Sequence, residues 1–301
     1  MPRLKFKDES WDELVPIFVE NNDNLEKIAT GVLLNIFDNI FLLTASHVID
    51  QAKNIGEEIQ IPTKNGFEYV AGTLYHRYLQ KNENREDDML DFSYYKLSKE
   101  MIDVLETCFN PLTEEMIELS DDFSTELEIP DKLPHIKELK KHLKSIYDNQ
   151  TIENNEKLKL IEDFREKTNI TFAGYSNTKT KEKDDGFYSE LCYYHGHGVN
   201  KSIYKQYNYI PEDNIIASFA KMGTMNSDFD HSIHPKPDGI SGGGIYRLIH
   251  TEEGIDRKLI GIGHTYKTKK HLFIGTNLFF CLSIIIKRIE RENISNSELK
   301  Q

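Results

Sequence analysis

The sequence is poor in the features that mark several large classes of protein. Its three cysteines, Cys108, Cys192 and Cys281, are far apart and form no C-x-x-C pair, so neither a disulfide framework nor a zinc site is expected. The longest apolar run, Leu278 to Ile286, is far shorter than the roughly 20 residues that cross a bilayer. We therefore expect free, mostly buried thiols and no membrane association.

Positive charge is also scarce. Lys and Arg number 37 against 50 Asp and Glu, and the formal net charge is -13. Because binding to phosphates needs a concentrated positive surface, no nucleic-acid partner is expected. The basic residues near the N-terminus are not followed by the apolar run of a secretory signal, which predicts a cytoplasmic location. Hydrophobic residues at 38% and aromatics at 11% indicate a folded globular protein.

Short runs rich in Val, Ile, Leu and Phe predict a mainly β protein. The run 31–43 contains the turn signal Asp38-Asn39, which makes it a hairpin. Thr44 is then predicted to open a short helix. Many short strands with polar turns between them favour an antiparallel barrel or sandwich. Further strands are expected at 14–19, 57–62, 67–76, 91–97, 169–175, 188–195, 214–220, 244–249, 258–264 and 271–275.

Helical spacing replaces the strand pattern in the middle of the chain. Apolar residues three and four apart predict two helices between about 99 and 168, and the segment 277–290 has the same spacing behind a plausible N-cap, Asn277. We therefore predict a β unit over 1–98, a helical insertion over 99–168, and a second β unit with a closing helix over 169–301. The apolar positions of the insertion are Leu133, Ile136, Leu139, Leu143, Ile146, Leu158, Ile161 and Phe164.

The segment from Pro237 to Gly244 has the residues that an acyl-transfer nucleophile needs. Ser241 lies between glycines at positions minus two and plus one, and glycine adopts backbone angles that other residues resist. The N–H groups of Gly239 and Ser241 could then converge on the oxygen of a tetrahedral intermediate. A glycine-rich turn with an incidental serine is the alternative when this segment is taken alone.

Two further segments supply a base and an acid. His47 directly follows an apolar strand, and histidine is the usual proton shuttle for a serine hydroxyl, although a lone histidine is more often structural. Asp91 begins a strand with large aromatic residues, so it would be partly buried and in need of a partner such as an imidazole. Asp87 and Asp88 compete with it, but they belong to a polar stretch expected to be a solvent-exposed loop.

Taken together, these segments resemble the trypsin-like (chymotrypsin-fold) serine peptidases of bacterial cytosolic type. That family carries T-A-[AS]-H, D-x-[AS] and G-x-S-G-G in this order, and this sequence has TASH at 44–47, DFS at 91–93 and GISGG at 239–243. Strand sequences at 31–34, 171–176 and 259–264 add to the resemblance.

The resemblance implies two six-stranded antiparallel β-barrels, with a helical insertion and a C-terminal helix in this chain. It implies that His47, Asp91 and Ser241 are catalytic, that the Gly239 and Ser241 N–H groups form the oxyanion hole, and that neither metal nor cofactor is needed. Ile240 replaces the aspartate that pairs with a freed N-terminus in digestive members, so activation of that type is not expected.

The specificity of the substrate pocket stays open. Its predicted lining includes Lys236 and His264, which would favour an acidic side chain, and Asp238, which would favour a basic one. The alternative for Lys236 and His264 is that they are surface residues without substrate contact. The other predicted pocket residues are Pro235, Gly263 and Thr265.

The prediction for function is a serine endopeptidase that hydrolyses proteins or peptides inside the cell. Resemblance to bacterial members suggests a stress or antiviral defence system and control by a partner protein. The alternative is a non-catalytic trypsin-fold module that binds peptides or signals; retention of all three catalytic side chains favours the enzyme.

Overall fold

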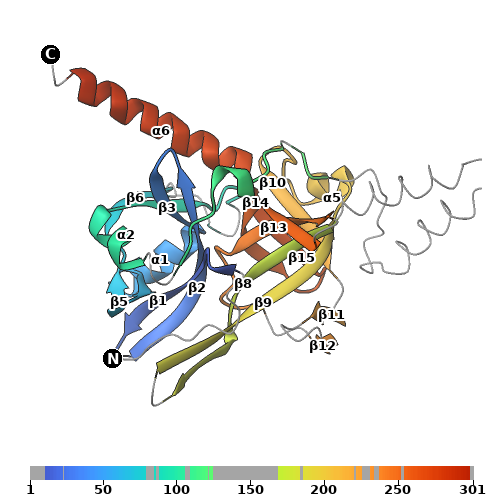
Figure 1. The fold of residues 1–301 in the computed structure, drawn as a ribbon. Helices are drawn as coiled ribbons and strands as arrows, with labels where there is room; N and C mark the ends of the chain where they lie inside the picture. Colours follow the sequence, from blue (N-terminus) through green and yellow to red (C-terminus); the bar gives the residue numbers. More distant parts are fainter. Residues whose placement is uncertain are drawn as a thin grey trace, which may run out of the picture.

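The chain folds into two antiparallel β units that lie side by side, and a long helix, α6 (Leu278–Glu298), extends from the second unit past the first (Figure 1). The predicted mainly β fold class is confirmed. The computed structural model describes residues 11–22, 24–78, 85, 88–105, 109–120, 122–124, 169–183, 186–219, 222–225, 231–233, 237–251 and 254–298.

The first unit is a seven-stranded sheet in the order β5-β4-β1-β2-β3-β7-β6. The predicted strand 67–76 is divided into two, because Gly72 has a φ of +150° and approaches the Lys96 backbone so closely that a Cβ would collide with it. The two pieces form opposite edges of the sheet. The strands are β1 (Leu14–Asn21), β2 (Asn24–Ile36), β3 (Asn39–Thr44), β4 (Gln60–Thr63), β5 (Gly66–Tyr69), β6 (Gly72–His76) and β7 (Ser93–Leu97).

The predicted hairpin around Asp38 joins β2 to β3. Phe37 and Asp38 both have positive φ, 49° and 58°, which is the backbone form that matches the twist of a two-residue hairpin. After β3 comes the helix α1 (Ser46–Asn54). Its N-cap is Ala45, one residue later than the predicted Thr44. The Thr44 hydroxyl does not cap the helix; it donates to the Thr30 carbonyl on β2 instead (3.0 Å).

The second unit is a closed barrel in the order β10-β15-β14-β13-β8-β9, with the six strands that were predicted. Its interior is filled by apolar and aromatic side chains such as Phe172, Ile245 and Phe273. β8 and β9 continue past the barrel as a two-stranded hairpin (Figure 1). The strands are β8 (Asn169–Lys183), β9 (Gly186–Gly198), β10 (Asn214–Phe219), β13 (Gly244–Thr251), β14 (Gly254–Lys267) and β15 (Leu272–Asn277).

Three small elements of the second unit were missed by the sequence analysis. They are α5 (Lys201–Gln206) and the strand pair β11 (Met222–Met225) and β12 (His231–Ile233). The N-cap of α5 is Asn200, whose side chain accepts from the Ser202 N–H (2.8 Å). An Asn followed by one turn of helix is too short a pattern to predict from spacing alone.

The segment between the two units is only partly described. It contains α2 (Lys99–Leu105) and η3 (Glu114–Met116). Residues around them run in extended form from one unit to the other: Leu112 exchanges backbone hydrogen bonds with β2, and the Glu118 N–H donates to the Leu259 carbonyl on β14 (3.0 Å). The two helices predicted between 133 and 164 lie outside the described residues.

One apolar core joins the two units. It contains Leu34 and Phe41 from the first sheet, Tyr246 from the barrel and Ile285 from α6, all 0–1% exposed. Burying one such side chain fully contributes about 1.5–3 kcal/mol to stability. The hydrophobic effect therefore holds the two units together, as it stabilises each of them. Asn277 caps α6 as predicted: its side chain accepts from the Phe279 N–H (3.0 Å).

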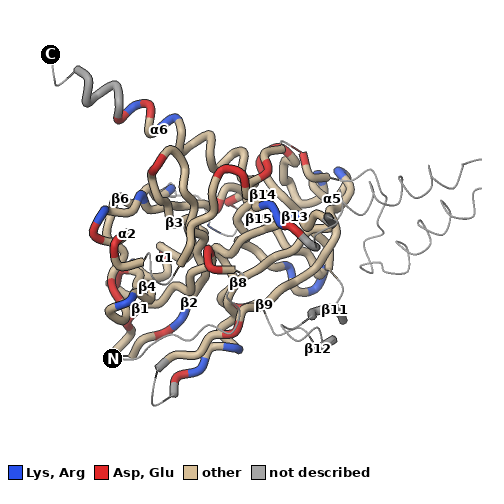
Figure 2. The backbone as a smooth tube through the Cα atoms, in the orientation of Figure 1, with Lys and Arg blue, Asp and Glu red and all other residues tan. Residues whose placement is uncertain are grey.

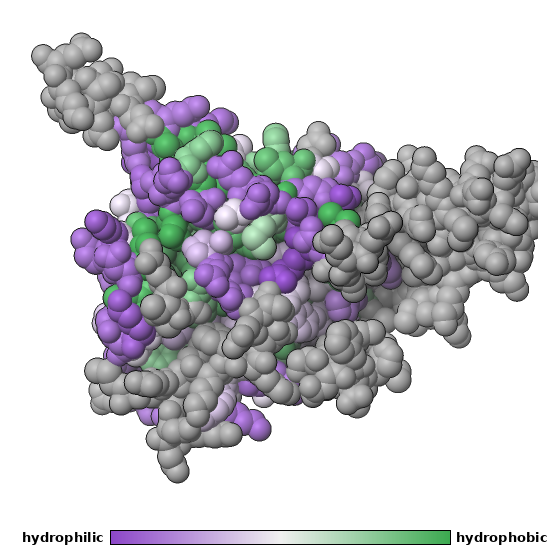
Figure 3. All heavy atoms as spheres, viewed as in Figure 1, coloured by the Kyte–Doolittle hydropathy of each residue, from purple (hydrophilic) through white to green (hydrophobic). Residues whose placement is uncertain are grey.

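The described surface mixes residue types. Acidic and basic residues are both scattered along the tube of Figure 2, and hydrophilic and hydrophobic residues intermingle on the face seen in Figure 3. Among the described residues, no helix combines the length and hydropathy needed to cross a membrane. Cys192 and Cys281 are buried free thiols, whereas Cys108 lies outside the described residues.

Candidate active site

His47 lies in the first turn of α1, directly after the buried end of β3. The neighbouring Ser46 hydroxyl donates to the Phe92 carbonyl (2.7 Å) and lies 2.7 Å from the Ser93 hydroxyl. These two contacts tie the start of the helix to the start of β7, which is the strand that follows Asp91. The chain thus brings its predicted base and its predicted acid to one place through their immediate neighbours.

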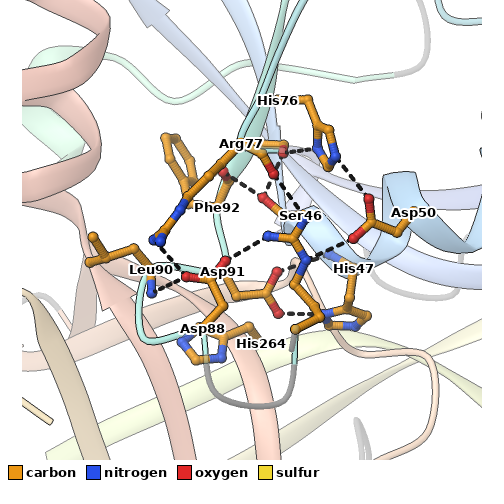
Figure 4. A network of polar contacts seen from close by, with 12 residues as sticks. Ser46, His47, Asp50, His76, Arg77, Asp88, Leu90, Asp91, Phe92 and His264 are labelled. Atoms are coloured by element: carbon orange, nitrogen blue, oxygen red, sulfur yellow. Dashed lines mark hydrogen bonds and ion pairs between the residues drawn. The ribbon is translucent and has the colours of Figure 1, made fainter. Parts of the chain in front are cut away.

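Asp91 contacts His47 through both carboxylate oxygens. Its Oδ1 accepts from the His47 backbone N–H (2.9 Å), and its Oδ2 lies 2.5 Å from Nδ1 of the ring (Figure 4). An ionised carboxylate only accepts hydrogen bonds, so Nδ1 carries a proton, and in the uncharged form of the ring Nε2 is then an acceptor. The imidazole is 32% exposed, whereas the Asp91 side chain is only 4% exposed.

Two opposing effects act on the Asp91 carboxyl. Burial favours its neutral form, but the hydrogen bonds and the charge of His47 outweigh burial and hold the pKa of Asp91 below its usual value. The acid is therefore ionised at neutral pH and can stabilise an imidazolium on His47.

Asp88 has different partners. The prediction that it is solvent-exposed is wrong, because two arginines pair with its buried side chain: Arg77 and Arg85 each lie 2.6 Å away. Asp88 also accepts from the Leu90 N–H (3.1 Å). Of the competing acids, Asp91 is thus the one in contact with His47, and Asp87 lies outside the described residues.

A second hydrogen-bonded chain lies behind the pair. His76 contacts Asp50 through Nε2 and the Ser93 hydroxyl through Nδ1, both at 2.8 Å, and Arg85 donates to Asp50 (2.7 Å) (Figure 4). Burial lowers the pKa of His76, so the ring is neutral at pH 7. The sequence analysis did not single out this chain. No motif marks it, because its members come from α1, β6, β7 and a loop.

Ser241 lies on the turn that precedes β13, and its backbone holds it in place. Its carbonyl accepts from the Thr30 N–H on β2 (2.9 Å), and the next N–H, that of Gly242, donates to the Gly263 carbonyl (2.6 Å). Gly242 has a φ of +83°, and a Cβ there would collide with Thr30 on β2 and with Thr44, the last residue of the strand that leads to His47. This turn therefore packs directly against the β3–α1 junction.

The Ser241 hydroxyl donates to the His264 carbonyl at 3.3 Å. Within the described residues, no hydrogen bond joins it to His47. Hydrogen bonds of this kind are often long or differently aligned in an unliganded enzyme and form when substrate binds. The chain thus brings the serine to the segment next to the histidine without placing the two side chains in contact.

The backbone N–H groups of Gly239 and Ser241 donate to no acceptor in the described part of the chain. Gly239 has a φ of +88°, and the carbonyl of Asp238 accepts from the Asn177 N–H (2.7 Å). In a trans peptide the C=O and N–H point in opposite directions, so the Gly239 N–H is aimed away from Asn177. Among the described residues, neither predicted oxyanion donor therefore has an acceptor.

His264 lies beside Asp91 and is buried (5% exposed) (Figure 4). Its Nδ1 contacts the Thr265 hydroxyl (2.9 Å), and its Nε2 is buried without a hydrogen-bond partner among the described residues. Burial lowers the pKa of His264 to about 4, against the attraction of Asp91. This ring, predicted as pocket lining, is therefore neutral and packed behind the acid.

The other predicted pocket residues have varied surroundings. Asp238 is exposed, whereas Gly263 is buried against the Phe172 ring, which a Cβ would approach to 2.9 Å. Phe172 in turn stacks on Phe273 at 4.3 Å. Pro235 and Lys236 lie outside the described residues, so the specificity of the pocket stays a prediction.

Comparisons with known proteins give low similarity throughout. No family model and no curated protein matches the chain. It is similar to solved structures of neuropsin, a serine protease of mouse brain (14% identity, TM-score 0.48, 93% of this chain and 95% of that one), and of a Glu endopeptidase in complex with MPD (10%, 0.45, 94% and 92%). It is also similar to the VesB protease of Vibrio cholerae (14%, 0.46), covering 93% of this chain and 64% of that one. At these values the likeness assigns no activity, which has to be argued from the site.

Proposed function

We propose that the protein is a trypsin-like serine endopeptidase that cleaves proteins or peptides with Ser241, His47 and Asp91. The observation that carries this proposal is the two-point contact between His47 and the buried Asp91. It leaves Nε2 of the ring as the acceptor that a serine hydroxyl requires. The neighbouring turn supports the proposal, because it presents a serine together with two backbone N–H groups that have no described acceptor.

In the proposed reaction the Ser241 Oγ attacks the scissile carbonyl and passes its proton to Nε2 of His47. Asp91 holds the ring and stabilises the imidazolium, and the Gly239 and Ser241 N–H groups donate to the oxyanion. His47 then returns the proton to the leaving amine. A water molecule, deprotonated by His47, hydrolyses the acyl-enzyme and regenerates Ser241. No metal or cofactor takes part in these steps.

The contact between the Ser241 hydroxyl and the His264 carbonyl favours a second candidate, a module that binds peptides without cleaving them. In such a module the serine hydroxyl would stay engaged with the carbonyl. In the enzyme it turns toward His47 when substrate binds, which needs only rotation about one side-chain bond.

The proposal also includes where the enzyme acts and how it is controlled. The resemblance to bacterial cytosolic members supports an intracellular enzyme in a stress or antiviral defence system. A peptidase inside a cell must be kept from indiscriminate cleavage, which supports control by a partner protein. Identification of proteins that co-purify with Ser241→Ala, compared with Ser202→Ala, tests this part.

Labelling with a fluorophosphonate probe tests the activity, because the probe forms a covalent bond only with an activated serine. We expect labelling of the wild type and of Ser202→Ala, a change on the surface helix α5, and none of Ser241→Ala or His47→Ala. If Ser241→Ala is still labelled, the nucleophile is a different residue. If no variant is labelled, even with cell lysate added to supply an activator, the binding module is the correct function.

A further inference from the structure

Lys27 is a buried lysine of the first sheet that reaches the nucleophile turn of the second unit. It lies on β2 and is 7% exposed. Its Nζ donates to the Gly239 carbonyl (2.6 Å), to Asn177 Oδ1 (3.1 Å) and to the Tyr175 carbonyl. Two of these acceptors belong to β8 and the third to the turn, so one side chain connects three segments that are far apart in the sequence.

The acceptors around Lys27 match an ammonium group. It has three N–H bonds to donate, and three oxygens surround it. No carboxylate of the described residues pairs with it, and burial lowers its pKa well below the usual value. An apolar side chain at this position would avoid the cost of removing a charge from water. Because burying this lysine costs free energy, we infer that its three hydrogen bonds serve a function.

Those contacts orient the two peptide groups on either side of Gly239. The carbonyl of Gly239 accepts from Lys27 and from the Thr30 hydroxyl (3.1 Å). The carbonyl of Asp238 accepts from the N–H of Asn177, whose side chain is itself held by Lys27. Because each trans peptide is planar, fixing its carbonyl also fixes the N–H opposite. The direction of the Gly239 N–H is thus set by Asn177, whose side chain Lys27 holds, while Lys27 itself fixes the Gly239 carbonyl and with it the next peptide plane.

We propose that Lys27 is a positioning residue that holds the oxyanion turn in its competent form, so that the turn needs no cleavage or partner to form. This inference rests on the proposed peptidase function. The residue directly before Ser241 is the buried Ile240, so no acid at that position can hold the turn. Control by a partner would then act on access to the site rather than on the oxyanion turn.

The rate of fluorophosphonate labelling tests this role in the full-length protein. We expect Lys27→Met to label about 100- to 1,000-fold more slowly than the wild type, the usual loss for one oxyanion donor. Lys27→Arg, which keeps a buried cation with several N–H groups, should recover part of the rate. With p-nitrophenyl acetate as substrate, kcat should fall while KM changes little, because the oxyanion forms only after binding.

A matched control separates positioning from stability. Tyr204→Phe removes a buried hydroxyl of α5 that accepts from the Ile216 N–H on the barrel strand β10 (2.9 Å). This variant should lose stability and keep its labelling rate per folded molecule, with the folded fraction measured by circular dichroism.

The outcomes distinguish the two proposals. If the wild type and Ser202→Ala are labelled and folded Lys27→Met is labelled at the same rate, the positioning role is wrong and the peptidase function stands. If the wild type is not labelled, both fail. Should Lys27→Met not fold, Asn177→Ala serves instead, because Asn177 is exposed and the change removes one of the three acceptors; an unchanged rate in that variant also overturns the role.

Discussion

The two units hold their parts of the candidate site in different ways. In the first, His47 and Asp91 are held by side chains: a carboxylate with two contacts to one histidine, and the Ser46 and Ser93 hydroxyls beside them. In the second, Ser241 is held by the backbone: its carbonyl accepts from the Thr30 N–H, and the next N–H, that of Gly242, donates to the Gly263 carbonyl. Proton transfer needs an oriented ring, whereas oxyanion binding needs oriented backbone N–H groups.

This difference predicts which substitutions harm each part. The acid–base part should respond to loss of a charge or hydroxyl and tolerate changes in backbone freedom nearby. The nucleophile turn should respond to any added Cβ and tolerate changes in charge around it, Lys27 excepted. Four predictions test this contrast, from the largest expected effect to the smallest.

The largest effect is expected for the acid–base part. Asp91→Asn keeps the shape of the side chain but no longer favours the ring tautomer with the proton on Nδ1, so kcat should fall about 10⁴-fold. Steady-state hydrolysis of p-nitrophenyl acetate measures this. Asp88→Asn is the matched control: its contacts are with Arg77 and Arg85, so it should lose stability rather than kcat. The reverse result would assign the catalytic acid to Asp88.

The nucleophile turn should be broken by one added methyl group. In Gly239→Ala, φ is +88° and the Cβ would collide with the side chains of Asn177 and Lys27, so labelling should slow by about 100- to 1,000-fold. Gly56→Ala is the control, since Gly56 has a φ of +79° with nothing within 4 Å. It should lose about 1 kcal/mol of stability and keep its labelling rate. Equal labelling of both variants would contradict the contrast.

His264 links the two parts and should make stability depend on pH. Its pKa is lowered to about 4 in the folded chain against about 6.5 unfolded, so the unfolded state binds the proton first. Stability is then fully present above pH 6.5 and is lost as the pH falls toward 4, by at most about 3 kcal/mol. Urea unfolding at several pH values should show a shallower loss in His264→Asn. A loss identical to wild type would mean that His264 is not the group that titrates.

The smallest effect is expected behind the acid–base pair. Ser93→Ala removes a hydroxyl that contacts both Ser46 and His76, which should cost about 1–2 kcal/mol of stability. The change in kcat should stay under about tenfold, because the direct contacts between His47 and Asp91 remain. Thermal unfolding and ester hydrolysis measure the two effects. A loss of kcat as large as that of Asp91→Asn would make this chain part of the catalytic machinery.

Secondary structure and topology class were largely predictable from the sequence, because strand and turn patterns are local. The hairpin at Asp38 and the Asn277 cap of α6 each depend on a few adjacent residues. The division of strand 67–76 was missed because Gly72 is required by the distant Lys96 backbone. Likewise, α5 and the β11–β12 pair are too short to leave a periodic signal.

In the candidate site, too, local motifs were predictable from the sequence and long-range contacts were not. The sequence identified His47, Asp91 and Ser241 because each lies in a short motif of adjacent residues. Asp50, His76 and Lys27 have no such motif, since their partners lie on other elements. No spacing rule predicts a contact between residues whose segments meet only after packing.

The sequence by itself determined that the chain forms two antiparallel β units and which side chains are candidates for acid, base and nucleophile. Only the tertiary structure decided that Asp91 rather than Asp88 contacts His47, that His264 is buried behind the acid, and that Lys27 reaches Gly239, 212 positions away. The physical reason is that turn and strand preferences act over a few residues, whereas these contacts exist only because one apolar core packs the two units together.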